Sequence, residues 1–160
     1  MSVEVVEYDE AWPVRFTAEA DQIRAALGSQ LRKIEHVGST SVPGLAAKPI
    51  VDVALSVESF DTLDIAALEE LGYRYVQEYD AETPNRRYFS KPGYHLHAYE
   101  QEHEEFLDYV RFRDYLRTHD EDRDAYGALK VRLGRNHEPV EYQDAKSPFV
   151  ARLVAMLRRG

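Results

Sequence analysis

The segment PIVDVALSV, residues 49–57, constrains the fold more than any other part of the chain. β-Branched and apolar residues dominate it, which makes it the strongest strand signal in the sequence. Because side chains alternate along a strand, Ile50, Asp52 and Ala54 share one face. A buried carboxylate without a partner costs roughly several kcal/mol. Asp52 therefore needs a partner: a turn that it caps, a buried arginine or a metal ion.

The residue patterns on either side of this strand predict helix, strand, strand, helix, strands and then helices. The expected helices span residues 12–30, 59–72, 104–117, 121–135 and 147–159. The expected strands span residues 31–39, 49–57, 73–79, 86–89 and 94–99, the last two joined as a hairpin by SKPG, and residues 135–146 are expected to be a loop. This order indicates an α+β (α/β-like) fold in which helices pack a mixed sheet and a helical layer follows at the C-terminal end. The length of 160 residues indicates a single domain.

Charge and composition exclude or disfavour several classes of function. With 29 acidic and 20 basic residues the formal charge is −9, which disfavours non-specific binding to nucleic acids and to anionic membranes, although a local basic pocket can still hold a small anion. The absence of cysteine excludes thiolate metal sites and cysteine nucleophiles. No apolar run resembles a signal peptide or a membrane span, so a cytoplasmic protein is expected. The glutamate-rich runs at 78–82 and 100–105 are expected to be solvated surface.

A short turn precedes the Asp52 strand. Gly38 is followed by Ser39 and Thr40, and such a turn after a strand can direct backbone N–H groups and hydroxyls towards an anion. Gly-Ser is also an ordinary turn dipeptide. Mg²⁺ favours carboxylate, phosphate and water oxygens, so an aspartate close to an anion-binding turn suits a magnesium site.

The hairpin brings further candidates. Alternation places His95, His97 and Tyr99 on one face, where two imidazoles can reach one ion or one substrate group, or form hydrogen bonds that are purely structural. Arg86 and Arg87 are adjacent, so only one of them can point inward.

Two cations occupy apolar faces of the C-terminal helices. Arg113 and Lys130 each lie among apolar residues at helical spacing. An inward cation needs an anion, which is either a protein carboxylate such as Asp114 or Asp144 or a bound phosphate. Alternatively, the stems extend past the apolar face and expose the charges to water.

Five separated blocks of the sequence then resemble one family. They are HVGSTSVPGLAAKPIVDVAL, RRYF before YHLHAYE, FRDYLRTH, AYGALK and EYQDAK, in that order. These blocks resemble the GrpB family, whose chemistry is uncharacterised and whose fold is that of the nucleotidyltransferase superfamily. The likeness extends over nearly the whole chain and matches the element order given above.

The resemblance implies a nucleotide site. Gly38 and Ser39 match the phosphate-positioning turn of the superfamily, and Asp52 matches its first metal-binding acid. The second acid falls on Ala54, and His97 stands at the later-strand position. This implies one Mg²⁺ or Mn²⁺ ion at Asp52 and His97. The residues implied to bind the phosphates or the nucleotide are Gly38, Ser39, Thr40, Lys48, Arg87, Arg113 and Lys130.

Three functional hypotheses follow. The first is an enzyme that binds a nucleotide and a divalent ion, with Asp52 as its catalytic acid, and transfers a nucleotidyl group to an acceptor. The second is a non-catalytic module that binds a nucleotide or another phosphorylated small molecule. The third is an interaction domain in which Asp52 forms a structural salt bridge. Because fold does not fix function, the residues of the site must decide among them.

Overall fold

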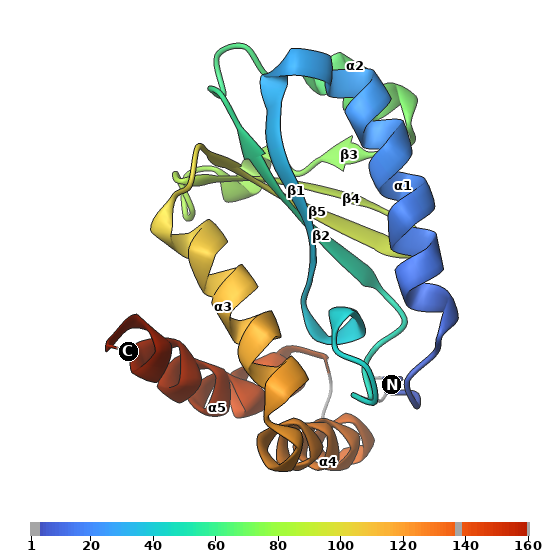
Figure 1. Ribbon diagram of the computed structural model, residues 1–160, viewed down its shortest axis with the longest axis vertical. Helices are drawn as coiled ribbons and strands as arrows, with labels where there is room; N and C mark the ends of the chain where they lie inside the picture. Colours follow the sequence, from blue (N-terminus) through green and yellow to red (C-terminus); the bar gives the residue numbers. More distant parts are fainter. Residues whose placement is uncertain (1–3, 137–138, 160) are drawn as a thin grey trace.

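A five-stranded mixed sheet forms the centre of the protein. The computed structural model describes residues 4–136 and 139–159 (Figure 1). Across the sheet the strands are ordered β1 (Leu31–Val37), β2 (Val51–Val57), β5 (Tyr94–Glu100), β4 (Arg86–Lys91) and β3 (Arg74–Tyr75). β2 and β5 are parallel, and the other neighbours are antiparallel. This confirms the predicted α+β fold with a mixed sheet.

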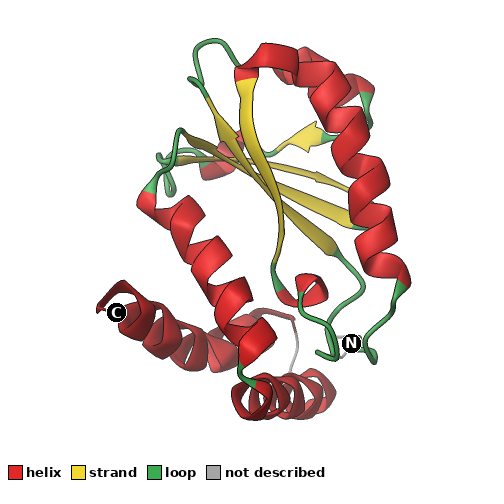
Figure 2. Cartoon of the chain, viewed as in Figure 1, coloured by secondary structure: helices red, strands yellow, loops and turns green. Residues whose placement is uncertain are grey.

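Helices cover the two faces of the sheet unequally. The helices α1 (Ala11–Leu27) and α2 (Ile65–Glu70) lie on one face, and α3 (Glu104–Thr118) lies on the other (Figure 2). The helices α4 (Asp120–Asn136) and α5 (Pro139–Arg159) pack against α3 and against each other, which gives the predicted C-terminal helical layer.

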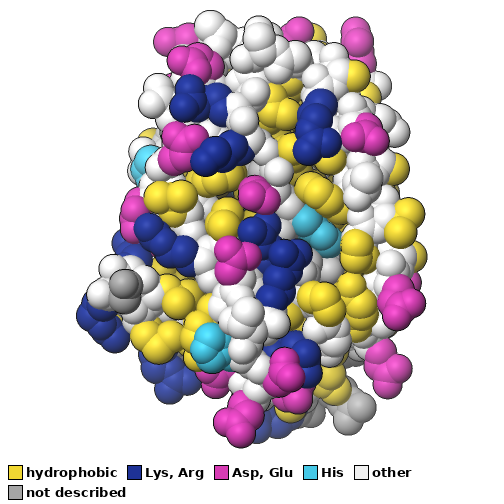
Figure 3. All heavy atoms as spheres, in the orientation of Figure 1, with side chains coloured by type: hydrophobic (Ala, Val, Ile, Leu, Met, Phe, Trp, Pro, Cys, Tyr) yellow, Lys and Arg dark blue, Asp and Glu magenta, His cyan; other side chains and the backbone are white. Residues whose placement is uncertain are grey.

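Charged side chains of both signs cover much of the outer surface. On the face seen in Figure 3, Lys and Arg side chains are interspersed with Asp and Glu side chains. Exposed ion pairs on β1 join Arg32 to Glu58 (2.9 Å) and Lys33 to Glu102 (3.5 Å). In the part of the chain that the structure describes, no helix is both long enough and apolar enough to cross a membrane.

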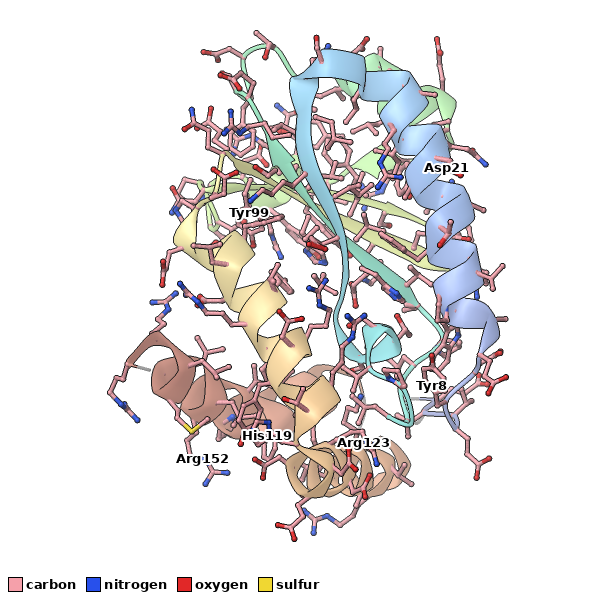
Figure 4. The ribbon with its side chains drawn as sticks, in the orientation of Figure 1. Tyr8, Asp21, Tyr99, His119, Arg123 and Arg152 are labelled. Carbon is pink, nitrogen blue, oxygen red and sulfur yellow. The ribbon has the colours of Figure 1, made fainter. Side chains whose placement is uncertain are left out.

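The alternation of β2 divides the interior into two parts. The α1 face of the sheet carries the main core, and its residues from β2 are Val51, Val53, Leu55 and Val57. The α3 face carries Asp52 and Ala54, as predicted, and Ala54 packs in a smaller apolar cluster with Val37, Tyr99 and Phe106. Tyr99, labelled in Figure 4, lies between the sheet and α3. Asp52 therefore belongs to the face with the smaller core.

Most predicted elements are confirmed, including the first helix, the hairpin and the first two C-terminal helices. The helix predicted over 59–72 is shorter, because the Asp64 side chain accepts a hydrogen bond from the Ala67 backbone N–H (3.0 Å) and fixes its start. The strand predicted over 73–79 covers only Arg74–Tyr75 before a 3₁₀ turn, η3 (Gln77–Tyr79), begins.

The loop predicted over residues 135–146 is wrong. Helix α4 continues to Asn136 and α5 already begins at Pro139, eight residues before the predicted start at 147. A proline in the first turn of a helix loses no hydrogen bond, and its fixed φ angle suits that position. Pro139 therefore starts a helix here instead of marking a loop, and only residues 137–138 of the predicted loop lie outside the described residues.

Candidate functional site

A cavity of about 800 Å³ opens between the α3 face of the sheet and the C-terminal helices. This volume is within the range of small-molecule sites in proteins, roughly 300–1,000 Å³. Its charged and histidine lining residues are Lys48, Asp52, Arg86, His95, His97, Glu105, Asp108 and Lys130. Its aromatic lining residues are Tyr79, Tyr88, Tyr99, Tyr109, Phe112 and Tyr126. The cavity thus combines cations, carboxylates and rings.

Asp52 lies beside two histidines. In the parallel pairing of β2 with β5, His95 is directly opposite Asp52 and His97 is opposite Ala54. The His97 Nε2 atom lies 3.1 Å from Asp52 Oδ1, and the His95 Nδ1 atom lies 3.7 Å from the same oxygen. Both histidines therefore face the cavity, as the alternation predicts.

The turn after β1 lies directly on the carboxylate of Asp52. Gly38 has φ +72°, and a Cβ atom at this position would lie 2.5 Å from Asp52 Oδ2, so the turn requires glycine. Ser39 lines the cavity. The hydroxyl of Thr40 instead lies 2.9 Å from His36 Nε2 in the buried interior. The predicted turn and the predicted acid are thus neighbours, but Thr40 is not part of the cavity wall.

The other nitrogen of His97 faces two donors. Arg86 Nη1 lies 3.3 Å from His97 Nδ1, and the Tyr109 hydroxyl lies 3.5 Å from it. An arginine N–H can only donate, so Nδ1 accepts and the ring proton sits on Nε2, where it is donated to Asp52. The chain Arg86–His97–Asp52 fixes the tautomer and the orientation of the imidazole.

Burial shifts the ionisation of several cavity groups. It lowers the pKa of His95, an effect that the charge of Asp52 partly offsets. Burial, followed by the negative charge of Asp52, raises the pKa of Tyr88 and the pKa of Tyr109 to about 12. His95 is therefore neutral near pH 7, and both phenols keep their protons as hydrogen-bond donors.

Arg86 and Arg87 point to different environments. Among the residues that the structure describes, Arg86 forms no ion pair with a carboxylate, and its buried Nε has no hydrogen-bond partner. Arg87 lies 3.6 Å from Asp80 in an ion pair and 4.2 Å from the centre of the Phe60 ring. The structure thus places Arg86 in the cavity wall and does not bring Arg87 there.

The two cations of the C-terminal helices also differ. Arg113 is buried and pairs with Glu35 (3.0 Å) and Asp114 (2.9 Å), which satisfies its charge away from the cavity. Lys130 lines the cavity, is 1% exposed, and its Nζ lies 4.7 Å from the centre of the Tyr126 ring. The side chain of Asp144 lies outside the described part of the chain.

A metal ion would find one carboxylate and one imidazole close together here, those of Asp52 and His97. The described residues contain no group of three or more His, Cys, Asp or Glu side chains arranged to hold a metal. Hard divalent ions commonly complete their ligand set with substrate phosphates and water. The donor set at Asp52 and His97 therefore fits a metal only together with oxygen atoms of a bound ligand.

Comparison with known proteins gives the family. Residues 2–156 match the family described as "GrpB protein". The chain belongs to the GrpB family. It is 38% identical to the UPF0157 protein BH1888 of Halalkalibacterium halodurans, over 96% of this chain and 81% of that protein. It is 34% identical to the UPF0157 protein YqkA of Bacillus subtilis, over 84% of this chain and 40% of that protein, so it spans less than half of YqkA.

A solved structure agrees with this assignment. The crystal structure of conserved protein GrpB from Enterococcus faecalis superposes with a TM-score of 0.89 over 96% of each chain, at 34% identity. This GrpB-family fold therefore extends through the sheet and the helical layer that together form the cavity.

Sequence patterns did not identify some cavity residues of this GrpB chain. Tyr79 and Glu105 belong to the two acidic runs that were expected to be solvated surface, yet both line the cavity. Helical spacing contains a signal for Glu105, because it shares a helix face with Asp108, Tyr109 and Phe112. Tyr79 lies in a 3₁₀ turn, and no periodicity in the sequence predicts its direction.

Proposed function

We propose that this GrpB-family protein binds a nucleotide with one Mg²⁺ or Mn²⁺ ion in the cavity and transfers a nucleotidyl group to an acceptor. The observation that carries the proposal is Arg86. It is a cation in the cavity wall without a carboxylate among the described residues, and it stands beside His97, which contacts Asp52. A partly buried guanidinium favours an anionic ligand.

The phosphates fit the basic part of the cavity. Arg86 can offer a planar pair of N–H donors to phosphate oxygens, whereas Lys48 and Lys130 offer single ammonium groups. The turn at Gly38 and Ser39 lies against Asp52 and supports a phosphate next to the acid. Of the residues implied by the family resemblance, Arg87, Arg113 and Thr40 lie outside this group.

Asp52 and His97 would hold the divalent ion. Bound there, the ion would neutralise phosphate charge and make the α-phosphorus easier to attack. For Nε2 of His97 to be a ligand, its proton must move to Nδ1, so the Arg86 N–H must turn away from Nδ1 towards the phosphates and leave the Tyr109 oxygen to accept the Nδ1 hydrogen bond. Imidazole suits Mn²⁺ better than Mg²⁺, so Mn²⁺ is the better match for this pair.

His95 is the best placed proton acceptor. It lines the cavity within 3.7 Å of Asp52, and burial lowers its pKa, so it is neutral near pH 7. In the proposed transfer an acceptor hydroxyl forms a bond to the α-phosphorus, the bond to pyrophosphate breaks, and His95 receives the hydroxyl proton.

A second candidate is a binding module without catalysis, and Ala54 favours it. The superfamily pattern places a second carboxylate there, but Ala54 is fully buried among Val37, Tyr99 and Phe106. A carboxylate at this position would be desolvated beneath α3. Two-metal chemistry thus has no support at this position, and binding alone requires only the cations and the rings.

Thermal unfolding with ligands tests binding. ATP, CTP or GTP with Mn²⁺ should raise the melting temperature of the wild type, because a ligand that binds only the folded state stabilises it. Asp52→Ala should abolish the shift. Asp21→Ala, on α1 on the opposite face of the sheet, should leave it unchanged. No shift with any nucleotide would contradict both candidate functions.

Pyrophosphate release separates the enzyme from the binding module. The protein should release pyrophosphate from an α-labelled triphosphate when a suitable acceptor hydroxyl is supplied. Release that persists in Asp52→Asn would contradict the role given to Asp52. A melting shift without release under any acceptor would favour the binding module.

A further inference from the structure

The aromatic side chains of the cavity form a continuous series from its mouth to Asp52. The rings of Tyr79 and Tyr88 are stacked, with centroids 5.6 Å apart and planes at 17°. Tyr88 lies 5.3 Å from the His97 ring, and His97 lies 5.1 Å from the Tyr109 ring. Since His97 contacts Asp52, this aromatic wall connects the proposed reaction centre with the cavity mouth.

Tyr79 is the exposed end of the aromatic wall. Three large hydrophobic side chains are exposed among the described residues: Val14 (69%), Tyr79 (43%) and Met156 (38%). Of these, Tyr79 lines the large cavity. Single exposed apolar side chains are common on proteins, but a stacked pair of rings at the mouth of a binding-sized cavity offers a flat surface to a ligand.

The local backbone holds Tyr79 in place. Its N–H donates to the Val76 carbonyl (3.1 Å), and its carbonyl accepts hydrogen bonds from the N–H and the hydroxyl of Thr83, both at 2.9 Å. Stacking on Tyr88 supports the ring itself. A platform that is fixed before binding loses little conformational entropy when a ligand stacks on it.

The platform adjoins the cation that carries the proposed function. The Arg86 guanidinium lies 5.0 Å from the centre of the Tyr88 ring, and the same guanidinium contacts His97. A ligand that places an anion at Arg86 therefore has an aromatic surface immediately beside that anion. A phosphorylated compound with a planar ring matches both features, whereas inorganic phosphates and sugar phosphates match only the first.

We infer that Tyr79 and Tyr88 form a ring-binding subsite and that the ligand is a nucleotide whose base stacks there. This inference rests on the proposed function and adds the part of the ligand that the rings recognise. Stacking discriminates little between bases, because every base has a π face. The subsite therefore favours bases in general over compounds without a ring.

Calorimetry with two probes tests the subsite in the full-length protein with Mg²⁺ present. ATP carries a ring and tripolyphosphate does not. Tyr79→Leu keeps an apolar side chain but removes the flat ring, and should weaken ATP binding by roughly 5- to 150-fold, as expected for the loss of one base–aromatic stack. Tripolyphosphate binding should change by less than about twofold. Tyr79→Phe should bind ATP as the wild type does, and Val14→Ala serves as the control for an exposed apolar side chain outside the cavity.

The outcomes distinguish failure of the ring-binding subsite from failure of the proposed nucleotide-binding function. Equal effects of Tyr79→Leu on ATP and tripolyphosphate, or no effect on either, would overturn the ring subsite while phosphate binding stands. Tripolyphosphate that binds the wild type as tightly as ATP would also overturn it. Failure of both probes to bind the wild type would remove the proposed function and the subsite together.

Discussion

Glu19 and Arg86, on opposite faces of the sheet, use charge in opposite ways. On the α1 face, Glu19 accepts hydrogen bonds from Lys91 Nζ and from the Tyr73 hydroxyl, each at 2.7 Å, and Lys91 also donates to the Leu71 carbonyl at 3.0 Å. On the α3 face, Arg86 lines an open cavity with a buried Nε that has no partner among the described residues. Closed charge clusters of the first kind specify packing, whereas open ones of the second kind are suited to binding.

The largest expected effect on stability comes from a substitution in the closed cluster of Glu19, Lys91 and Tyr73. Glu19→Leu removes a 5%-exposed carboxylate and leaves the ammonium of Lys91, whose side chain is 15% exposed, without its counter-ion. Loss of one partner of a buried pair costs about 3–5 kcal/mol, so the free energy of unfolding measured in urea should fall by that amount. Nucleotide binding on the α3 face should persist wherever the variant is folded.

A double variant is the control. Glu19→Leu with Lys91→Met replaces the pair by apolar side chains and should lose less stability than Glu19→Leu alone. A loss below about 1 kcal/mol in Glu19→Leu would show that this cluster is not the closed, stabilising one described.

Acid should weaken the α1 face through His36. This buried ring stacks on Phe16, and burial, helped by the charge of Arg117, lowers its pKa from 6.5 to about 4. Between these values the unfolded chain binds more protons than the folded one. Above pH 6.5 His36 therefore does not reduce the free energy of unfolding, and this free energy falls as the pH decreases towards 4. The loss is about 3 kcal/mol, at about 1.4 kcal/mol per pH unit.

Denaturation curves at several pH values measure this effect. His36→Gln keeps a hydrogen-bonding group for Thr40 but does not titrate, so its stability should depend less steeply on pH in this window. Identical slopes in the two proteins would assign the acid sensitivity to other groups.

A smaller effect should follow from the turn at the cavity. Gly38→Ala places a Cβ atom 2.5 Å from Asp52 Oδ2 at φ +72°, and such backbone strain costs about 1–3 kcal/mol. The carboxylate must also move, so the nucleotide-dependent rise in melting temperature should disappear.

A second glycine provides the control for this turn. Gly28 has φ +55°, and a Cβ atom added there would meet nothing within 4 Å. Gly28→Ala should therefore lose stability through backbone strain alone and keep the nucleotide effect. If Gly38→Ala kept the nucleotide-dependent rise in melting temperature, the turn at Gly38 would not be part of the nucleotide site.

Local patterns in the sequence predicted much of this arrangement. Alternation along one strand placed Asp52 and Ala54 on a face apart from the valines, and alternation along another placed His95 and His97 together. These two predictions depend only on the period of a strand. The family resemblance, and not periodicity, implied that Gly38 and Asp52 belong to one site, and the structure brings them into contact across β1 and β2.

The rest depended on contacts between distant segments. Arg113 looks like Lys130 in helical spacing, but its partner Glu35 lies 78 residues away in the sequence. The pairing of Tyr88 with His97 decides which of the adjacent arginines faces the cavity, and register between strands is not visible in a local pattern. Pattern alone therefore identifies candidate residues but not which of them meet.

The smallest expected effect sharpens the comparison within one strand. Arg86→Gln removes a guanidinium from the cavity and should weaken ATP binding about tenfold, as expected for a lost charged hydrogen bond of about 1.5 kcal/mol. Arg87→Gln removes the same charge one residue along the chain, where it pairs with Asp80, and should change ATP binding by less than about twofold. The two variants have the same net charge. Any difference between the ATP affinities that calorimetry measures for them therefore comes from the position of the guanidinium that was removed. Equal weakening would mean that long-range charge, and not a contact at Arg86, attracts the anion, because both guanidiniums contribute alike to the field of the whole protein.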